Sequence, residues 1–278
     1  MKAIKTTLVL LLSFAASPIF LKGQTIEQKY KDSFSRLIEY HSDIKYLNQS
    51  LEKLYPVAIM EDSSYYIFEF GNNSYFLARK VKKNTPLPDK IRAAFPLAEY
   101  DNQFVCVVTG DVFDTKAAYA TIFHEFVHCY QGTTVEWELK SEIDSFNKAI
   151  KEKNYMWELN HAFPYENNEF AGLYKNMVLS FQSGNPEVAL GYRTKLKTVL
   201  SKDDFDYMSW EEWKEGFARY IENLLRDNWG LERNTTDTEG EMNRVWFYEG
   251  GSLLIAHLLS ENEIFKNELR LLYSAIIK

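Results

Sequence analysis

The stretch "DTKAAYATIFHEFVHCYQG", residues 114–132, decides the fold and the chemistry of this chain. Its centre, HEFVH, holds His124, Glu125 and His128. Four residues turn an α-helix by about 400°, so the two imidazoles lie on one face, about 6 Å apart along the axis. Two imidazoles at this spacing can chelate one metal ion. The alternative is an ordinary amphipathic helix that carries two histidines.

The surrounding pattern predicts that HEFVH lies inside a capped helix. Apolar residues recur at helical spacing from Ala118 to Tyr130. Asp114 or Thr115 can cap the start of this helix, and Gly132 is placed to end it.

Zn²⁺ is the ion that suits this pair, because imidazole nitrogens satisfy its tetrahedral geometry and leave a position for water. Such an ion lowers the pKa of its water toward about 7, and the hydroxide that forms attacks a polarised carbonyl. Glu125 projects to where it can accept the proton of that water. The predicted site therefore has one Zn²⁺ ion, His124 and His128 as ligands, and Glu125 as the general base.

A catalytic zinc site needs a third protein ligand, and no histidine follows His128 at short spacing. A carboxylate from a second helix is the remaining common solution. The main candidate is Glu215, in "SWEEWKEGFARYIENLL" (209–225). The alternatives are Glu142, Glu166 and Glu169.

The segment around Glu215 has its own helix signals. Ser209 with Glu212 resembles a capping box that begins a helix, and Gly230 is placed to end it. Glu215 and Glu222 fall on one face, and the small residue Gly216 would let another helix approach closely.

These motifs resemble the gluzincin branch of the zinc peptidases, in particular the aminopeptidase N family. HEFVH and then "WKEGFARY" (213–220) follow the order of that family, and "FYEGGSLL" (247–254) is similar to its Y-x-K-G-x-x-x-L segment. The resemblance covers roughly residues 100–260. It implies a zincin-like fold, Glu215 as the third ligand, and Tyr248 as the donor to the oxyanion.

Two features depart from the family pattern. Glu215 comes much farther along the chain than the third ligand of the family, so the segment around 135–205 would be a helical insertion. The exopeptidase signature G-x-M-E-N, which recognises a free substrate amine, is not present. The sequence therefore leaves open whether the enzyme trims termini or cuts internally.

The whole chain predicts an α+β protein, with a small mixed or antiparallel sheet followed by a mainly helical lobe. Residues 26–54 have helical spacing, and "YYIFEFGNNSYFLARKV" (65–81) predicts a β-hairpin. Residues 104–108 predict a strand, which is either an edge strand that pairs with substrate or an interior strand. We expect the chain to divide into a signal peptide at 1–23, a region with the N-terminal helix and the sheet at 24–110, and a helical zinc-peptidase region at 111–278.

Residues 1–23 resemble a secretory signal peptide, with Lys2 and Lys5 before an apolar run; the alternative is a retained anchor helix. We therefore expect a secreted or periplasmic protein without stable membrane insertion after signal removal. The formal net charge of −7 disfavours nucleic acid as a partner. Export would permit a disulfide between Cys106 and Cys129, but buried free thiols are equally compatible with the sequence.

The predicted function is an exported zinc-dependent peptidase that acts on a peptide or protein substrate. One alternative is a catalytically silent zincin-fold protein that binds peptides or proteins. Another is a zinc hydrolase of a non-peptide substrate. The oligomeric state is not indicated.

Overall fold

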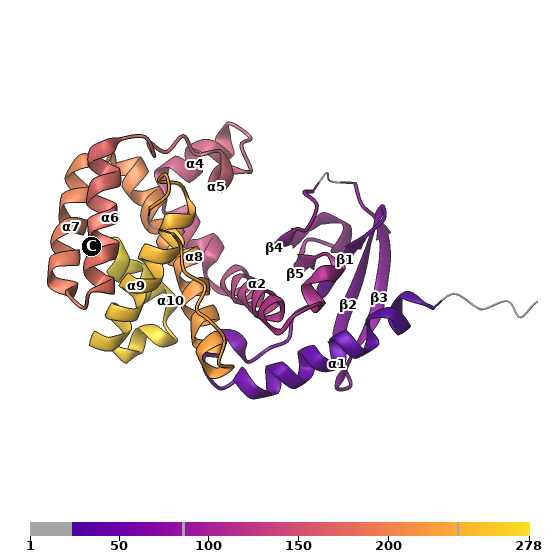
Figure 1. The fold of residues 1–278 in the computed structure, drawn as a ribbon. Coiled ribbons are helices and arrows are strands. Elements are labelled where there is room, and N and C mark those ends of the chain that lie inside the picture. Colours follow the sequence, from indigo (N-terminus) through magenta and orange to yellow (C-terminus); the bar gives the residue numbers. More distant parts are fainter. Residues whose placement is uncertain (1–23, 85–86, 238) are drawn as a thin grey trace, which may run out of the picture.

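A computed structural model describes residues 24–84, 87–237 and 239–278. The predicted signal peptide lies outside these ranges. The described residues form one five-stranded sheet and a larger set of helices, which confirms the predicted α+β class. Figure 1 shows the sheet on one side of the molecule, most of the helices on the other, and α2 between them.

The sheet is mixed, as predicted, and has the order β3-β2-β1-β5-β4. Strands β1 and β5 are parallel, and the other neighbours are antiparallel. The bounds of the strands are β1 Val57–Glu61, β2 Ser64–Gly71, β3 Ser74–Lys82, β4 Arg92–Leu97 and β5 Gln103–Val108.

The predicted hairpin is confirmed as β2 and β3. Asn72 and Asn73 join its strands with φ values of 50° and 62°. Both values are positive, as a two-residue type I′ turn requires.

The strand predicted at 104–108 is also confirmed, as β5, but it lies inside the sheet between β1 and β4. The edge-strand alternative is therefore wrong for these residues. The edge of the sheet next to β5 is formed by β4, for which the sequence shows no strand signal.

Ten α-helices lie within the described ranges. Their bounds are α1 Ile26–Ile44, α2 Lys116–Thr134, α3 Glu136–Ser141, α4 Asp144–Lys151, α5 Trp157–Asn160, α6 Asn168–Gln182, α7 Pro186–Val199, α8 Lys202–Asn228, α9 Val245–Glu261 and α10 Leu269–Ile276. The segment expected to be a helical insertion, around 135–205, is occupied mainly by α3 to α7. None of the described helices combines the length and the apolar content that a membrane crossing needs.

Two predicted helix ends are wrong. Helix α2 does not end at Gly132 but runs to Thr134. Gly132 instead makes room for the ring of Phe104 on β5, since a Cβ atom there would lie 2.1 Å from that ring. The first helix is also shorter than predicted, because α1 ends at Ile44 and only a short 3₁₀ turn, Gln49–Leu51, follows.

The predicted start of α8 is wrong as well. Ser201 caps this helix, and its hydroxyl accepts a hydrogen bond from the Asp204 amide. Ser209 lies buried within the helix, where Arg193 donates to its hydroxyl at 3.3 Å. The predicted end is confirmed: Gly230 has a φ of 68° and follows the last turn of α8, the usual place of a left-handed glycine.

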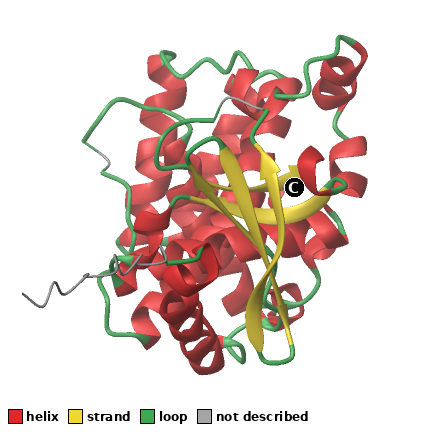
Figure 2. Ribbon diagram, turned by 90° about the vertical axis from the view of Figure 1, so that its right-hand side faces the viewer, coloured by secondary structure: helices red, strands yellow, loops and turns green. Residues whose placement is uncertain are grey.

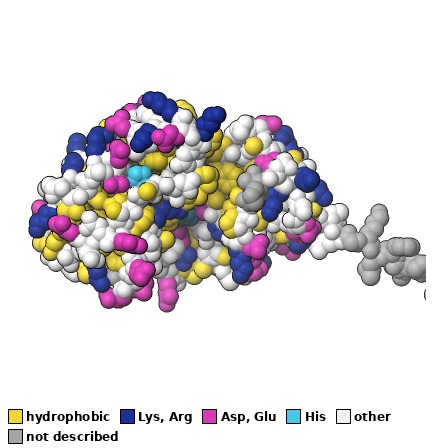
Figure 3. Space-filling view, turned by 90° about the horizontal axis from the view of Figure 1, so that it is seen from above, with side chains coloured by type: hydrophobic (Ala, Val, Ile, Leu, Met, Phe, Trp, Pro, Cys, Tyr) yellow, Lys and Arg dark blue, Asp and Glu magenta, His cyan; other side chains and the backbone are white. Residues whose placement is uncertain are grey.

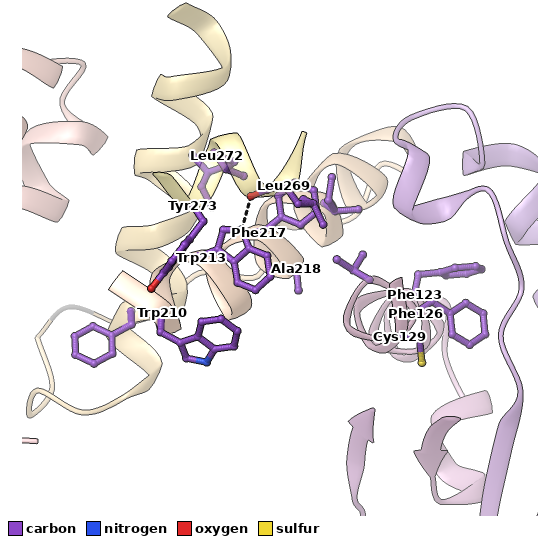
Figure 4. Close-up of a cluster of buried hydrophobic side chains, with 14 of the residues drawn as sticks. Phe123, Phe126, Cys129, Trp210, Trp213, Phe217, Ala218, Leu269, Leu272 and Tyr273 are labelled. Atoms are coloured by element: carbon purple, nitrogen blue, oxygen red, sulfur yellow. Dashed lines mark hydrogen bonds between the residues drawn. The ribbon is translucent and has the colours of Figure 1, made fainter. Parts of the chain in front are cut away.

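Two clusters of buried side chains cover the two faces of the sheet. The larger cluster joins one face to α1, α2 and the helical part, and it includes Phe123, Trp213 and Leu272. Figure 4 shows part of it, with the Trp213 indole donating to the Leu269 carbonyl. The smaller cluster lies on the other face and includes Tyr65 and Val107. Figure 2 views the sheet with the helices behind it. One core therefore holds α2 against both the sheet and α8.

Candidate metal centre

Helices α2 and α8 bring together three side chains that could hold a metal ion: His124, His128 and Glu215. The Nε2 atoms of the two histidines are 3.1 Å apart. Glu215 Oε2 lies 3.7 Å from the Nε2 atom of His124 and 3.4 Å from that of His128. The third ligand predicted from the motif thus lies beside the histidine pair.

The outer nitrogen of each histidine has a defined partner. His124 Nδ1 lies 3.0 Å from Glu222 Oε2, and a carboxylate oxygen can only accept. His128 Nδ1 lies 2.9 Å from Gln131 Oε1. The amide nitrogen of Gln131 donates to the carbonyl of Lys214 at 3.2 Å, which turns its oxygen toward His128. Both Nδ1 atoms therefore carry the hydrogen of the neutral imidazoles.

This arrangement leaves three electron-pair donors facing one another. With the hydrogens on Nδ1, both Nε2 atoms present lone pairs; they lie 3.1 Å from each other, and Glu215 Oε2 lies 3.7 Å and 3.4 Å from them. Three acceptors this close repel one another unless a cation lies between them. In the protein alone a proton would supply that charge: burial lowers the pKa of His124, but hydrogen bonds with Glu215 and Glu222 outweigh it and raise this pKa to about 10.

The donor set fits zinc. Ligand atoms about 2.0–2.1 Å from a tetrahedral zinc ion are about 3.3–3.4 Å apart, close to the separations of these three atoms. Two imidazoles and one carboxylate are a ligand set of catalytic zinc, which leaves a fourth position for water or substrate. The Glu215 side chain is 12% exposed, so the cluster is not sealed from solvent.

Glu222 is held in place by further polar contacts. Arg226 Nε donates to its Oε1 atom at 2.7 Å, and the Asn234 amide donates to the same atom at 3.0 Å. The second carboxylate oxygen remains directed at His124. Sequence reasoning had placed Glu222 on the face of Glu215 without assigning it a role, and it missed Gln131, which lies one helical turn after His128.

Glu125 and Tyr248 are the two predicted catalytic side chains. Glu125 is 6% exposed, and burial raises its pKa although both histidines lower it. The ring centre of Tyr248, on α9, lies 5.6 Å from the guanidinium carbons of both Arg219 and Arg244, and burial raises the pKa of its phenol well above its usual value. Glu125 follows His124 directly on α2, and Tyr248 lies on the helix that packs against α8.

The other sequence candidates lie elsewhere. Glu142 bonds to Arg270 at 3.0 Å on an exposed surface, and Glu166 and Glu169 are exposed next to the start of α6. None of these three belongs to the metal-binding group found among the described residues.

The two cysteines, Cys106 and Cys129, are buried and unbridged, which agrees with the free-thiol alternative.

Comparison of the chain with protein-family models, with curated proteins and with solved structures finds no match. The gluzincin resemblance thus stays a prediction from motifs, and the case for a function depends on the geometry of the site.

Proposed function

We propose that this protein is an exported, gluzincin-like zinc peptidase that hydrolyses peptide bonds in a peptide or protein substrate. The observation that carries the proposal is the convergence of His124, His128 and Glu215. Acceptors at both Nδ1 atoms favour the tautomers in which Nε2 has no hydrogen and can bind a metal. One Zn²⁺ ion held by these three atoms would polarise the substrate carbonyl and acidify water.

Glu125 would act as general base and then as general acid. Its burial raises the pKa of its carboxyl. A carboxyl with a raised pKa can take a proton from water and later give it to the leaving amine near neutral pH.

Tyr248 would donate a hydrogen bond to the oxyanion of the tetrahedral intermediate. It stays protonated through the neutral range, because burial and the nearby carboxylates raise its pKa. A neutral phenol is a suitable donor to developing negative charge.

The edge strand β4 offers a place for an extended substrate. It is the last strand of the sheet and packs against α2, which carries the two histidines. Figure 1 shows β4 at the side of the sheet nearest the helical part, and Figure 3, seen from above, shows apolar side chains gathered in this region. An extended peptide that adds to this edge would gain main-chain hydrogen bonds. This supports a peptide as the substrate.

Metal analysis and the variant Glu125→Gln test the proposal. The purified protein should hold one zinc ion and cleave casein or a broad peptide library. Glu125→Gln should retain the ion and lose cleavage by several orders of magnitude, because the base is absent while the ligands are intact.

Two results would overturn the proposal. Absence of zinc would remove the metal centre. One bound zinc without cleavage of any peptide would favour a binding protein or a hydrolase of another bond.

A further inference from the structure

Arg244 lies beside the proposed catalytic tyrosine. It directly precedes α9, four positions before Tyr248, and its guanidinium carbon lies 5.6 Å from the centre of the Tyr248 ring. Residues four apart on a helix lie on the same face. The guanidinium is thus close to the atoms that the proposed reaction uses.

Most of the hydrogen-bond donors of Arg244 are uncommitted. A guanidinium carries five N–H groups. The one hydrogen bond of this side chain among the described residues is a long contact of 3.5 Å from Nη1 to Glu211 Oε2, and the side chain is 29% exposed.

Arg219 lies 5.6 Å from the same ring but is less exposed than Arg244. It donates to the Asn234 carbonyl at 3.1 Å, and its side chain is only 7% exposed. The Nε atom of Arg219 also has no hydrogen-bond partner among the described residues, but its side chain is buried, so Arg244 is the arginine beside Tyr248 that a ligand can reach.

Glu211 accepts only one long hydrogen bond from Arg244 and leaves its other donors unpaired within the described part of the chain. The Glu211 side chain is fully buried, and its Oε1 atom has no hydrogen-bond partner among the described residues. Burial raises the pKa of the Glu211 carboxyl well above its usual value, although Arg244 lowers it. The one long contact to Glu211 thus leaves the remaining donors of Arg244 available to a ligand.

The position of this pair sets where a bound group would lie along the substrate. Glu211 precedes Glu215 by four residues on α8, which is about 6 Å along the helix axis. One residue of extended peptide spans about 3.3–3.6 Å. An extended substrate that runs along α8 would therefore place the group held by Arg244 one or two residues from the cleaved bond.

We propose that Arg244 is a specificity-determining residue that binds a carboxylate of the substrate, one or two residues from the cleaved bond. The guanidinium fork matches a carboxylate, which accepts two parallel hydrogen bonds from it. The carboxylate belongs either to an acidic side chain or to the chain terminus. This inference rests on the proposed peptidase function.

The test compares matched ligands. Peptides that differ only by Glu against Gln at each position around the cleaved bond, or by a terminal acid against an amide, are assayed for kcat/KM with the zinc-loaded protein. Binding of the same peptides to Glu125→Gln is measured by calorimetry, as a readout independent of turnover. We expect one acidic series to be favoured about ten- to a hundredfold, the range of a charge-assisted hydrogen bond. The series that responds identifies the source of the carboxylate.

Variants then assign the preference to Arg244. Arg244→Gln should bring the acid-to-neutral ratio to about one, and Arg244→Lys should restore part of it, because the charge returns without the fork. The acid-to-neutral ratio of kcat/KM is the readout, because a general effect on Tyr248 would lower kcat/KM for the acidic and the neutral peptide alike. Arg233→Gln is the matched control: it removes an arginine paired with Asp227 whose side chain is 61% exposed. It should leave the ratio unchanged.

The outcomes separate this inference from the proposed function. Cleavage without preference for any acidic peptide in the wild-type protein, or a preference that persists in Arg244→Gln, would overturn the role of Arg244 and leave the peptidase intact. Absence of cleavage, with acid-selective binding that Arg244→Gln abolishes, would overturn the peptidase and leave the carboxylate site. The wild-type comparison does not depend on a variant that must fold.

Discussion

Gly216 of α8 and Gly251 of α9 meet backbone to backbone: a Cβ atom at Gly216 would lie 2.6 Å from the Cα atom of Gly251. The prediction that another helix approaches α8 closely at Gly216 is therefore confirmed, and that helix is α9. It seats Tyr248, one turn before Gly251, next to the helix that carries Glu215. Contact between these two glycines thus holds the helix of the proposed oxyanion donor against the helix that carries Glu215.

Substitution Gly251→Ala should disturb both stability and activity. Its Cβ atom would lie 2.3 Å from the Glu212 carbonyl oxygen, and backbone atoms cannot rotate away. We expect a loss of about 1–3 kcal/mol in the free energy of unfolding, the usual cost of overpacking. Denaturant unfolding measures it.

Gly191→Ala is the control for this change. Gly191 lies within α7, and a Cβ atom there would meet nothing within 4 Å. Alanine should be neutral or stabilise by about 0.5–1 kcal/mol, because glycine is a poor helix former. Equal stability of the two variants would show that the helices do not depend on the glycine contact.

Gln131→Met should weaken metal binding while the fold is retained. The change removes the acceptor that holds the hydrogen of His128 on Nδ1. Loss of such a supporting contact typically lowers metal affinity about 10- to 100-fold. Competition with a chromophoric chelator measures the affinity. Thr134→Val, at the exposed end of the same helix, should retain wild-type affinity.

Tyr248→Phe should lower kcat with little change in KM. The phenol would act on charge that develops only in the transition state, and removal of one such donor costs about 10²- to 10³-fold in kcat. Steady-state kinetics on one peptide measures both constants. Tyr192→Phe, on α7, is the matched control. A rise in KM at constant kcat would instead assign Tyr248 to ground-state binding.

Glu158 should make stability depend on pH in the acid range. Burial raises the pKa of its carboxyl, but Lys214 and Lys140 outweigh burial and lower it to about 2. In the unfolded chain the pKa of this carboxyl is 4.5. Its lower pKa in the folded protein therefore stabilises the fold fully at pH values above 4.5, and this stabilisation is lost as the pH falls through about 2.

Glu158→Gln should therefore lose on the order of 2–3 kcal/mol at neutral pH, and the difference from wild type should vanish toward pH 2. Denaturant unfolding across this pH range measures it. Glu138→Gln removes a carboxylate that is 62% exposed and pairs with Arg270, and it should change little. A constant difference between Glu158→Gln and wild type at all pH values would contradict this account.

The histidine pair of the candidate metal site was predictable because the two residues are only four positions apart in the sequence. His124 and His128 lie on one helix, so their separation of four positions places both side chains on the same face. Glu215 needed a motif, because packing brings α8 to α2 and the sequence between them does not show it. Gln131 and Arg244 gave no signal, since each acts through a partner that only the folded chain supplies.

The strand β4 and the start of α8 show the same limit. The stretch "RAAFPL", residues 92–97, contains two alanines and Pro96, which are poor strand formers. It pairs with only one neighbour, and an edge strand tolerates proline. The sequence pair Ser209 and Glu212 matches a capping box, but the helix continues through it because Arg193 satisfies both buried side chains.

The two unbridged thiols lie on facing elements, Cys106 on β5 and Cys129 on α2, and neither is exposed. A thiol-specific dye can reach them only when the sheet and the histidine-bearing helix separate. Labelling kinetics of the unmodified protein would thus time the opening of that interface, and no engineered probe would be needed.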